Sequence, residues 1–581
     1  MVIIILANAL RNDATVKGIN MGNFEVRQVL YADDMTIFMK NKESIKRLID
    51  VFEAFREMSG LKVNLDKTYI MPLGVGDYGI DPMGAPPLGK MVREVKVLGV
   101  YFSLDPQIRE ALNYKEILSK IKKLLGWWKQ RDLTIIGKVH LLKTYALSKL
   151  NYVSSSLIVP NWVFRDIEKI CFEFLWGGKD RIKRDIMYQD ISDGGLKMIN
   201  FKLFVKTQRV MWIKRLLYEE QNMGWKLYFD QCFKSVGGRL IFLCNYDADK
   251  MDVNAPPFYE EIIRAWQELE NCRNFEQAKF NPIVFNNKNV LRRGKMIFNE
   301  QLFEHNIYRF DHICDEEGMR TYAYFQGLGL SGQDIVNIWS LYDLILKTGK
   351  YIGKHVSWQN VDLNEYEIML KISQKIITFR KIQSRMVYGY FVENMQHTYS
   401  LKVRDGQNNF EFSQKMLSEI FVRPRITSII AKLREFQFKL LHGVIYTKVH
   451  LFRFGFAVDN LCSYCNHEME TYSHLFWECA HIKQLWKAAI EKFKFLELRN
   501  IEWKEIHVGI AGNSYRIKCC NCFILIMKYT IYTSRSNMVI PSLEDINKIS
   551  REFREGEKEI AVKRGILDKH VLKWENVRIM L

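Results

Sequence analysis

The sequence lacks any apolar run long enough to form a transmembrane helix, and no basic residue precedes the short apolar stretch Met1–Leu10. The first absence argues against a membrane protein, and the second argues against a secretory signal peptide. Without an export signal we expect an intracellular protein, in the cytoplasm or the nucleus. The 11 cysteines are then expected as thiols or metal ligands rather than as disulfides. Internal repeats and low-complexity tracts are also absent, which excludes a repeat array.

The composition is that of a large folded protein with an excess of positive charge. The chain has 581 residues, 48% hydrophobic and 13% aromatic, which is enough for three or four domains with buried cores. Its formal net charge is +19, with 85 Lys and Arg against 66 Asp and Glu. Such an excess predicts a polyanionic partner, either nucleic acid or an anionic membrane face.

Hydrophobic periodicity predicts a short mixed region followed by helices. Residues 24–39 read as a β-hairpin whose apolar runs suggest strands covered on both faces. Residues 42–59 have helical period and end at Ser59-Gly60. Further elements are predicted as strands at 61–71 and 95–102 and as helices from about residue 113, at 134–158, at 161–176 and in pieces between 200 and 430.

The acidic pair Asp33-Asp34 follows Tyr31-Ala32 at the reversal of the predicted hairpin. Adjacent aspartates on a regular strand point to opposite faces, but at a turn both can approach one site. Paired carboxylates are what a two-metal nucleotidyl transfer site needs to hold Mg²⁺. We expect Asp33 as the primary ligand and Asp34 as a supporting one. The alternative is an ordinary exposed Asp-Asp turn.

A second cluster combines cysteines and a histidine at metal-ligand spacing. Cys462 and Cys465 form a Cys-x-x-Cys pair, and His474 and Cys479 follow. Three thiolates and one imidazole make a closed tetrahedral shell for a structural Zn²⁺. His467 and His481 are alternative histidines, and buried thiols or a redox pair are alternative explanations. The nearby aromatic residues could stack on RNA or form a small core; they are Tyr464, Tyr472, Phe476 and Trp477. Cys519, Cys520 and Cys522 are read as core thiols.

Basic residues are concentrated in two segments, 120–131 and 179–184. In the second segment Lys179, Arg181, Lys183 and Arg184 could follow a phosphate backbone, although such a run is often only a solvated face. Trp127 and Trp128 could stack on bases, but Trp128 falls on the apolar helical stripe and is expected in the core.

Several strings together resemble LINE-type non-LTR retrotransposon reverse transcriptases. Tyr31–Asp34, Ser59–Asn64 with Lys67-Thr68, and Val97–Val100 resemble consecutive palm motifs, and Cys462–Cys479 resembles the zinc-binding element after the thumb. The resemblance implies Asp33 and Asp34 as catalytic metal ligands and Lys67 near the nucleotide phosphates. It also implies that Tyr31, Ala32, Leu98 and Gly99 lie near substrate or primer. A solvated lysine is the alternative for Lys67.

The family carries an upstream aspartate and fingers for which residues 1–20 leave no room. We therefore expect a C-terminal fragment of a retrotransposon polyprotein that does not polymerise alone, because two metal ions would lack a bridging carboxylate. The alternative is a non-catalytic RNA- or DNA-binding protein that uses its thumb and zinc knuckle. Expected partners are an RNA template and a DNA primer or target, without a membrane, and expected cofactors are Mg²⁺ and Zn²⁺.

The predicted fold class is α+β, mostly α. A partial reverse-transcriptase palm of a β-hairpin and a helix is followed by a helical thumb, a helical region and a zinc knuckle. The predicted segments are a partial palm at 1–105, a thumb-like domain at 106–200, a helical region at 201–430, a zinc-binding region at 431–500 and a helical tail at 501–581.

Overall fold

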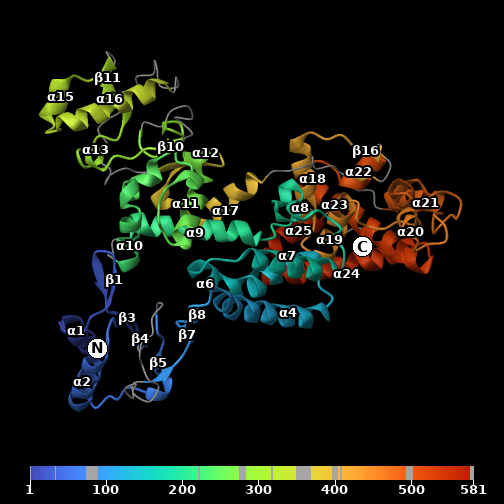
Figure 1. Cartoon of the computed structure of the whole chain (residues 1–581). Helices are drawn as coiled ribbons and strands as arrows, with labels where there is room; N and C mark the ends of the chain where they lie inside the picture. Colours follow the sequence, from blue (N-terminus) through green and yellow to red (C-terminus); the bar gives the residue numbers. More distant parts are fainter. Residues whose placement is uncertain are drawn as a thin grey trace. The chain divides into compact units, whose positions relative to one another are not determined.

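The structure, a computed structural model, describes residues 2–32, 34–73, 89–219, 223–273, 283–315, 318–347, 368–395, 404–405, 408–492 and 501–575. Within these ranges helices dominate and the strands pair two by two (Figure 1), which confirms the predicted α+β, mostly α class. No helix in the described ranges is long and apolar enough to cross a membrane.

The chain forms two compact units that alternate along the sequence. Unit 1 comprises Met1–Ile117, Leu150–Val163 and Lys202–Phe391, and unit 2 comprises Leu118–Lys149, Phe164–Phe201 and Val392–Leu581. The five segments predicted from the sequence remain predictions.

The N-terminal part of unit 1 consists of short strands and two helices. Their bounds are α1 (Val2–Asn12), β1 (Ile19–Met21), β2 (Phe24–Val26), β3 (Gln28–Tyr31), β4 (Asp34–Ile37), α2 (Lys42–Ser59), β5 (Tyr69–Ile70), β6 (Lys90–Met91), β7 (Glu94–Val97), β8 (Val100–Ser103) and α3 (Pro106–Glu110). Helix α2 has the predicted bounds because Asn41 caps its first turn and Gly60 ends it at φ 70°. Leu6, Leu10, Leu48 and Phe55 form the local core between α1 and α2.

The rest of unit 1 surrounds a large aromatic core. Trp266, Phe229 and Phe379 are each at most 1% exposed in it. Its elements are α6 (Ser148–Ser156), α9 (Phe201–Tyr218), α10 (Gly224–Cys232), α11 (Pro257–Gln267), α12 (Glu270–Arg273), β9 (Leu291–Arg292), β10 (Lys295–Met296), α13 (Glu300–Glu304), α14 (Phe310–Ile313), β11 (Cys314–Asp315), β12 (Gly318–Met319), α15 (Tyr322–Gly327), α16 (Gly332–Lys347), β13 (Met369–Ile372), β14 (Lys375–Thr378) and α17 (Ser384–Glu393).

Unit 2 is built of helices around a second core. Its elements are α4 (Glu116–Lys129), α5 (Ile135–Leu141), α7 (Asn161–Trp176), α8 (Arg184–Tyr188), β15 (Arg404–Asp405), β16 (Asn408–Asn409), α18 (Gln414–Thr427), α19 (Ala431–Leu441), α20 (Lys448–Arg453), α21 (Ala480–Lys492), α22 (Trp503–Val508), α23 (Tyr515–Ser534), α24 (Leu543–Lys563) and α25 (Leu567–Trp574). Residues of α19, α21, α23, α24 and α25 share one hydrophobic cluster with the segment 462–479.

One predicted hairpin and two predicted strands differ from the observed elements. The hairpin predicted over 24–39 is β3–β4 alone, because β2 pairs with β1. Only one of its faces is covered: Met35 and Ile37 pack on the local core of α1 and α2, whereas Val29 is 50% exposed. The strand predicted at 61–71 is reduced to β5, because Asn64 accepts a hydrogen bond from the Lys67 amide and caps a 3₁₀ turn over Leu65–Lys67.

The strand predicted at 95–102 is instead the hairpin β7–β8, with Val97 opposite Val100. Leu98 and Gly99 form its turn at φ 47° and 86°. Two successive residues with positive φ are the requirement of a tight hairpin turn whose twist matches that of its strands. The helix predicted at 161–176 has the bounds of α7, and that predicted at 134–158 is divided between α5 and α6.

Candidate metal centre and nucleic-acid surface

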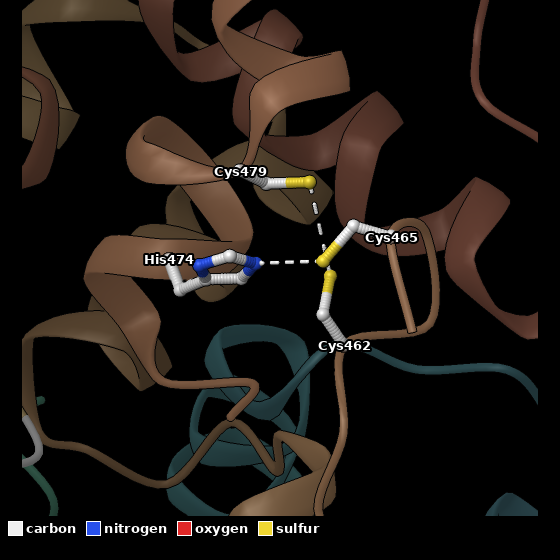
Figure 2. A group of neighbouring side chains, drawn as sticks. All are labelled: Cys462, Cys465, His474 and Cys479. Carbon is white, nitrogen blue, oxygen red and sulfur yellow. Dashed lines mark hydrogen bonds between the residues drawn. The ribbon is translucent and has the colours of Figure 1, made fainter. Parts of the chain in front are cut away.

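The predicted zinc ligands come together in unit 2 (Figure 2). Their ligand atoms all lie within 4.8 Å of one another, and the set contains Cys462, Cys465, His474 and Cys479. Cys465 Sγ lies 3.3 Å from His474 Nε2, and Cys462 Sγ lies 3.9 Å from Cys479 Sγ. Sulfurs bound to one tetrahedral Zn²⁺ at about 2.3 Å lie about 3.8 Å apart. The residues therefore fit a closed structural zinc site, and the cluster includes neither His467 nor His481.

Local backbone structure delivers each ligand. A β-bridge between Leu461 and Met469 closes the turn that carries the Cys-x-x-Cys pair. Within that turn, the Tyr464 amide donates to Cys462 Sγ at 3.4 Å. His474 begins a π-helical turn that ends at Glu478, and Cys479 follows directly before α21. The π-helical turn between His474 and Cys479 thus places both side chains near the turn that carries Cys462 and Cys465.

The three thiols have different acidities. Burial raises the pKa of Cys462 to about 12 and also raises that of Cys479. Burial acts in the same direction on Cys465, but the amides of Glu468 and His467 and the side chain of His474 outweigh it and lower its pKa to about 6. Zn²⁺ binds thiolates, so binding at this site would release protons from Cys462 and Cys479.

Two glutamates that the sequence did not single out support the ligand loop. Glu470 is fully buried and accepts hydrogen bonds from the Ser463 amide at 2.9 Å, the Ser463 hydroxyl at 2.6 Å and the Lys448 amide at 2.8 Å. Glu468 places a carboxylate oxygen 2.9 Å from His474 Nδ1, although the two groups are not aligned for a hydrogen bond. A carboxylate there favours the tautomer that presents Nε2 to a metal.

The aromatic residues beside the cluster form its core. Tyr464, Tyr472 and Phe476 are at most 8% exposed. Tyr464 donates its hydroxyl to the carbonyl of Ile531 in α23 at 2.6 Å, and Tyr472 donates to the carbonyl of Ile445 at 2.5 Å. Of the two alternatives for these residues, the packed core is the one observed. Cys519, Cys520 and Cys522 are buried in the same core, as predicted.

The predicted polymerase residues lie on two hairpins and a turn in unit 1. Tyr31 pairs with Asp34 across the β3–β4 reversal, and Ala32 adopts φ 53° there. Asp33 lies outside the described residues, and Asp34, Tyr31 and Lys67 are exposed. In the described ranges no hydrogen bond or ion pair joins Lys67 to Asp34. The turn of Leu98 and Gly99 is held by Tyr152, whose hydroxyl donates to the Leu98 carbonyl at 2.6 Å.

The basic segment 179–184 divides into two kinds of residue. Lys179, Arg181 and Lys183 are exposed on unit 2, and Arg181 lies over the ring of Tyr446 at 5.2 Å. Arg184 instead forms ion pairs of 2.8 Å with Glu168 and Asp180. Its guanidinium also stacks on Phe172, so Arg184 holds α8 against α7.

Trp128 is half-buried and Trp127 is 72% exposed on α4. The apolar stripe of this helix buries Leu118, Ile121 and Leu125, as its periodicity predicted.

Comparisons with known proteins find matches for both the N-terminal segment that contains the acidic hairpin and the segment that contains the metal cluster. Residues 3–102 match the family of reverse transcriptases (RNA-dependent DNA polymerases), and residues 407–486 match the family described as zinc-binding in reverse transcriptase. A 275-residue part of the chain is 21% identical to the Transposon TX1 uncharacterized 149 kDa protein of Xenopus laevis. The match covers 45% of this chain and about a fifth (21%) of that relative's length.

Proposed function

We propose that this chain, whose residues 3–102 and 407–486 match reverse-transcriptase families, is a fragment of an RNA-directed DNA polymerase of a LINE-type non-LTR retrotransposon. The observation that carries the proposal is the occurrence in one chain of the acidic hairpin β3–β4 and, after the helices, the four-residue metal cluster. In this proposal Asp33 and Asp34 would contribute to holding the Mg²⁺ that nucleotidyl transfer requires. Lys67 serves the nucleotide phosphates, and Leu98 and Gly99 contact the primer.

A polypeptide of these 581 residues does not extend a primer by itself in this proposal. Two-metal transfer needs a further carboxylate beside Asp33 and Asp34. Two carboxylates precede Tyr31 in the sequence, and both have other partners. Asp13 accepts hydrogen bonds from Thr15 and Arg47, and Glu25 accepts from the Gly18 amide and Arg27.

Primer extension tests this proposal. The 581-residue protein is incubated with an RNA template, an annealed DNA primer, deoxynucleotides and Mg²⁺, beside an Asp33→Ala/Asp34→Ala variant. We expect equal, background incorporation from both proteins. Incorporation by the parent that the variant abolishes would show that the two aspartates suffice with other residues of this chain.

The zinc cluster is proposed as a structural site that holds unit 2 together. Purified protein is expected to contain one zinc ion per chain by elemental analysis, because the four ligands close the metal shell. Cys462→Ser should lose the ion. Cys519→Ser, which changes a buried thiol outside the cluster, should keep it. Loss of zinc in both variants, or in neither, would contradict the assignment.

A second candidate is a non-catalytic nucleic-acid-binding protein that uses its thumb and zinc region. The exposure of Lys179, Arg181 and Lys183 favours it, since such residues release counterions from phosphates. RNA binding that weakens with salt, survives Asp33→Ala and disappears in Cys462→Ser would support this function. Absence of binding at moderate salt would remove it.

A further inference from the structure

Three phenylalanines that are close in sequence are exposed shortly before the first metal ligand, Cys462. Phe452 lies in the last turn of α20, and Phe454 and Phe456 follow in the turn that leads to Cys462. Their exposed fractions are 49%, 52% and 81%, whereas Tyr464, Tyr472 and Phe476 of the cluster itself are buried. We call Phe452, Phe454 and Phe456 the aromatic turn. Aromatic side chains at this exposure leave large apolar area in water, which marks a binding surface.

The aromatic turn is held in place by its backbone. Gly455 adopts φ 75° after the C-cap Phe454. The Phe456 amide donates to the carbonyl of Leu451 at 2.8 Å, and the Gly455 amide donates to that of Phe452 at 3.0 Å. These two bonds are those of a Schellman motif, in which the residue at the position of Phe456 commonly packs back on the helix. Here Phe456 is instead 81% exposed, so the motif presents its ring to solvent.

Positive charge adjoins the aromatic turn. Arg453 is exposed within it. The ring of Phe454 lies 5.7 Å from that of Tyr446, and the guanidinium of Arg181 lies over the same Tyr446 ring at 5.2 Å. The turn is thus continuous with the exposed basic residues Lys179, Arg181 and Lys183. The nearby acid Asp180 is paired with Arg184, and Asp459 is paired with Lys448.

We propose that the aromatic turn binds unpaired bases of a single-stranded nucleic acid whose phosphates lie along Lys179, Arg181 and Lys183. This inference rests on the nucleic-acid binding proposed above and adds a preference for single strands. Flat rings at fixed positions beside a basic segment are the arrangement on which successive bases stack. Bases in a duplex are already stacked on each other and are not available to the three rings.

The test compares binding of a labelled oligo(dT) strand and of a duplex of equal length by fluorescence anisotropy over a range of salt. Replacing all three rings, as Phe452→Ser/Phe454→Ser/Phe456→Ser, should weaken single-strand binding by about tenfold or more for each ring that contacts a base. The salt slope should stay unchanged, because no charge is removed. Arg181→Gln should instead lower the slope by about 0.7.

Two matched variants separate stacking from general apolar contact and from misfolding. Val458→Ser removes a 97% exposed aliphatic side chain from the same loop and should bind as the parent does. Phe456→Leu keeps an apolar residue but removes a ring, and should weaken binding. Retained zinc content in each variant verifies that the fold is intact.

Unchanged single-strand binding in the triple variant, with the parent binding normally, overturns this inference and leaves the proposed function standing. Equal loss of duplex binding also overturns it. If the triple variant instead loses adhesion to anionic phospholipid vesicles, or loses self-association, and still binds oligo(dT), the turn serves a membrane or a second copy. Absence of oligonucleotide binding by the parent overturns both this inference and the nucleic-acid-binding function on which it rests.

Discussion

Glu470 and Arg535 form an ion pair, with 2.8 Å between a carboxylate oxygen and a guanidinium nitrogen. The Glu470 side chain is fully buried and that of Arg535 is 14% exposed. Arg535 lies directly after α23, and it also donates to the carbonyl of Tyr446 at 2.8 Å. One buried carboxylate therefore ties the loop of Cys462 and Cys465 to the beginning of α20 and to the end of the longest apolar helix of unit 2.

Glu470→Gln should destabilise unit 2 by about 3 kcal/mol, because the change leaves the partly buried Arg535 without its counter-charge. It should also weaken zinc affinity by about 10- to 100-fold, as loss of groups that support ligands does. Urea denaturation and competition with a zinc-binding dye measure the two effects. Glu491→Gln, at an exposed position of α21, is the control. A change no larger than that of the control would mean that Glu470 does not hold the loop.

Lys528 should make the stability of unit 2 depend on pH. It is 1% exposed in α23, and burial lowers its pKa to about 7. Its ammonium donates to the neutral oxygens of Gln437 at 2.7 Å and His507 at 3.1 Å. Since the folded pKa lies below the ordinary 10.5, the unfolded chain binds more protons between pH 7 and pH 10.

The unfolding free energy of the parent, relative to that of Lys528→Met, should therefore rise by up to about 1.4 kcal/mol per pH unit above pH 7. Below pH 7 the difference should level off, because both states are then protonated. Urea titrations of both proteins at pH 6, 7, 8 and 9 measure this difference in unfolding free energy. Lys563→Met, at an exposed position of α24, should show no such slope. A parallel pH profile for parent and Lys528→Met would place the ammonium in contact with water.

The docking of α25 on α24 should depend on one buried ion pair. Glu557 and Lys573 lie 2.8 Å apart with side chains 3% and 9% exposed. Burial raises the pKa of the Glu557 carboxyl, but Lys573 and the hydrogen bonds from Ser428 and Trp574 outweigh it and lower the pKa overall. Each single change, Glu557→Gln or Lys573→Met, should cost about 3 kcal/mol, because the remaining charge is buried alone.

The double variant should be less destabilised than the sum of the two single variants, by about 1–3 kcal/mol. Equilibrium denaturation of the four proteins of this cycle gives the coupling energy directly. Additive effects would indicate that water reaches the pair.

The turn at Leu98 should be more stable with asparagine. Leu98 has φ 47°, a backbone region that costs a residue with a branched, bulky side chain about 1 kcal/mol and that asparagine tolerates. Leu98→Asn should therefore stabilise unit 1 by a similar amount, and it should weaken primer–template binding if the side chain contacts the primer. Thermal unfolding and anisotropy measure both quantities, with Val29→Thr on β3 as a control at an exposed, regular strand position. A destabilised Leu98→Asn protein would show that packing of the leucine outweighs the turn.

Local signals predicted those features of the chain that local chemistry decides. Asn41 and Gly60 fix both ends of α2, and the spacing of Cys462, Cys465, His474 and Cys479 indicated the four residues that the structure brings together, although His467 and His481 were alternatives. The stripe on α4 was also correct for Leu118, Ile121 and Leu125, whereas Trp128, expected in the core, is only half-buried. In each case the residues that give the signal lie within about twenty positions of one another along the chain.

Features that depend on distant partners were not predictable. The sequence could not tell whether Tyr464 and Phe476 face bases or a core, since the answer comes from α23, more than 50 residues later. It could not separate Arg184 from Arg181 either, because their partners lie on α7 and at Tyr446. Glu470 carries no signal of its own: an acidic residue between metal ligands is ordinarily solvated, and its burial depends on Arg535.

The seating of the zinc cluster on α23 has a consequence for how the protein can be shortened. The region that matches the zinc-binding family ends at residue 486. The hydrophobic core in which its ligands are packed, however, includes residues as far along the chain as Trp574. A polypeptide cut after the matched region would expose the rings of Tyr464 and Phe476 and the thiol of Cys462, and it would aggregate or oxidise rather than chelate. The segment that matches the zinc-binding family is therefore shorter than the segment needed to fold around the cluster.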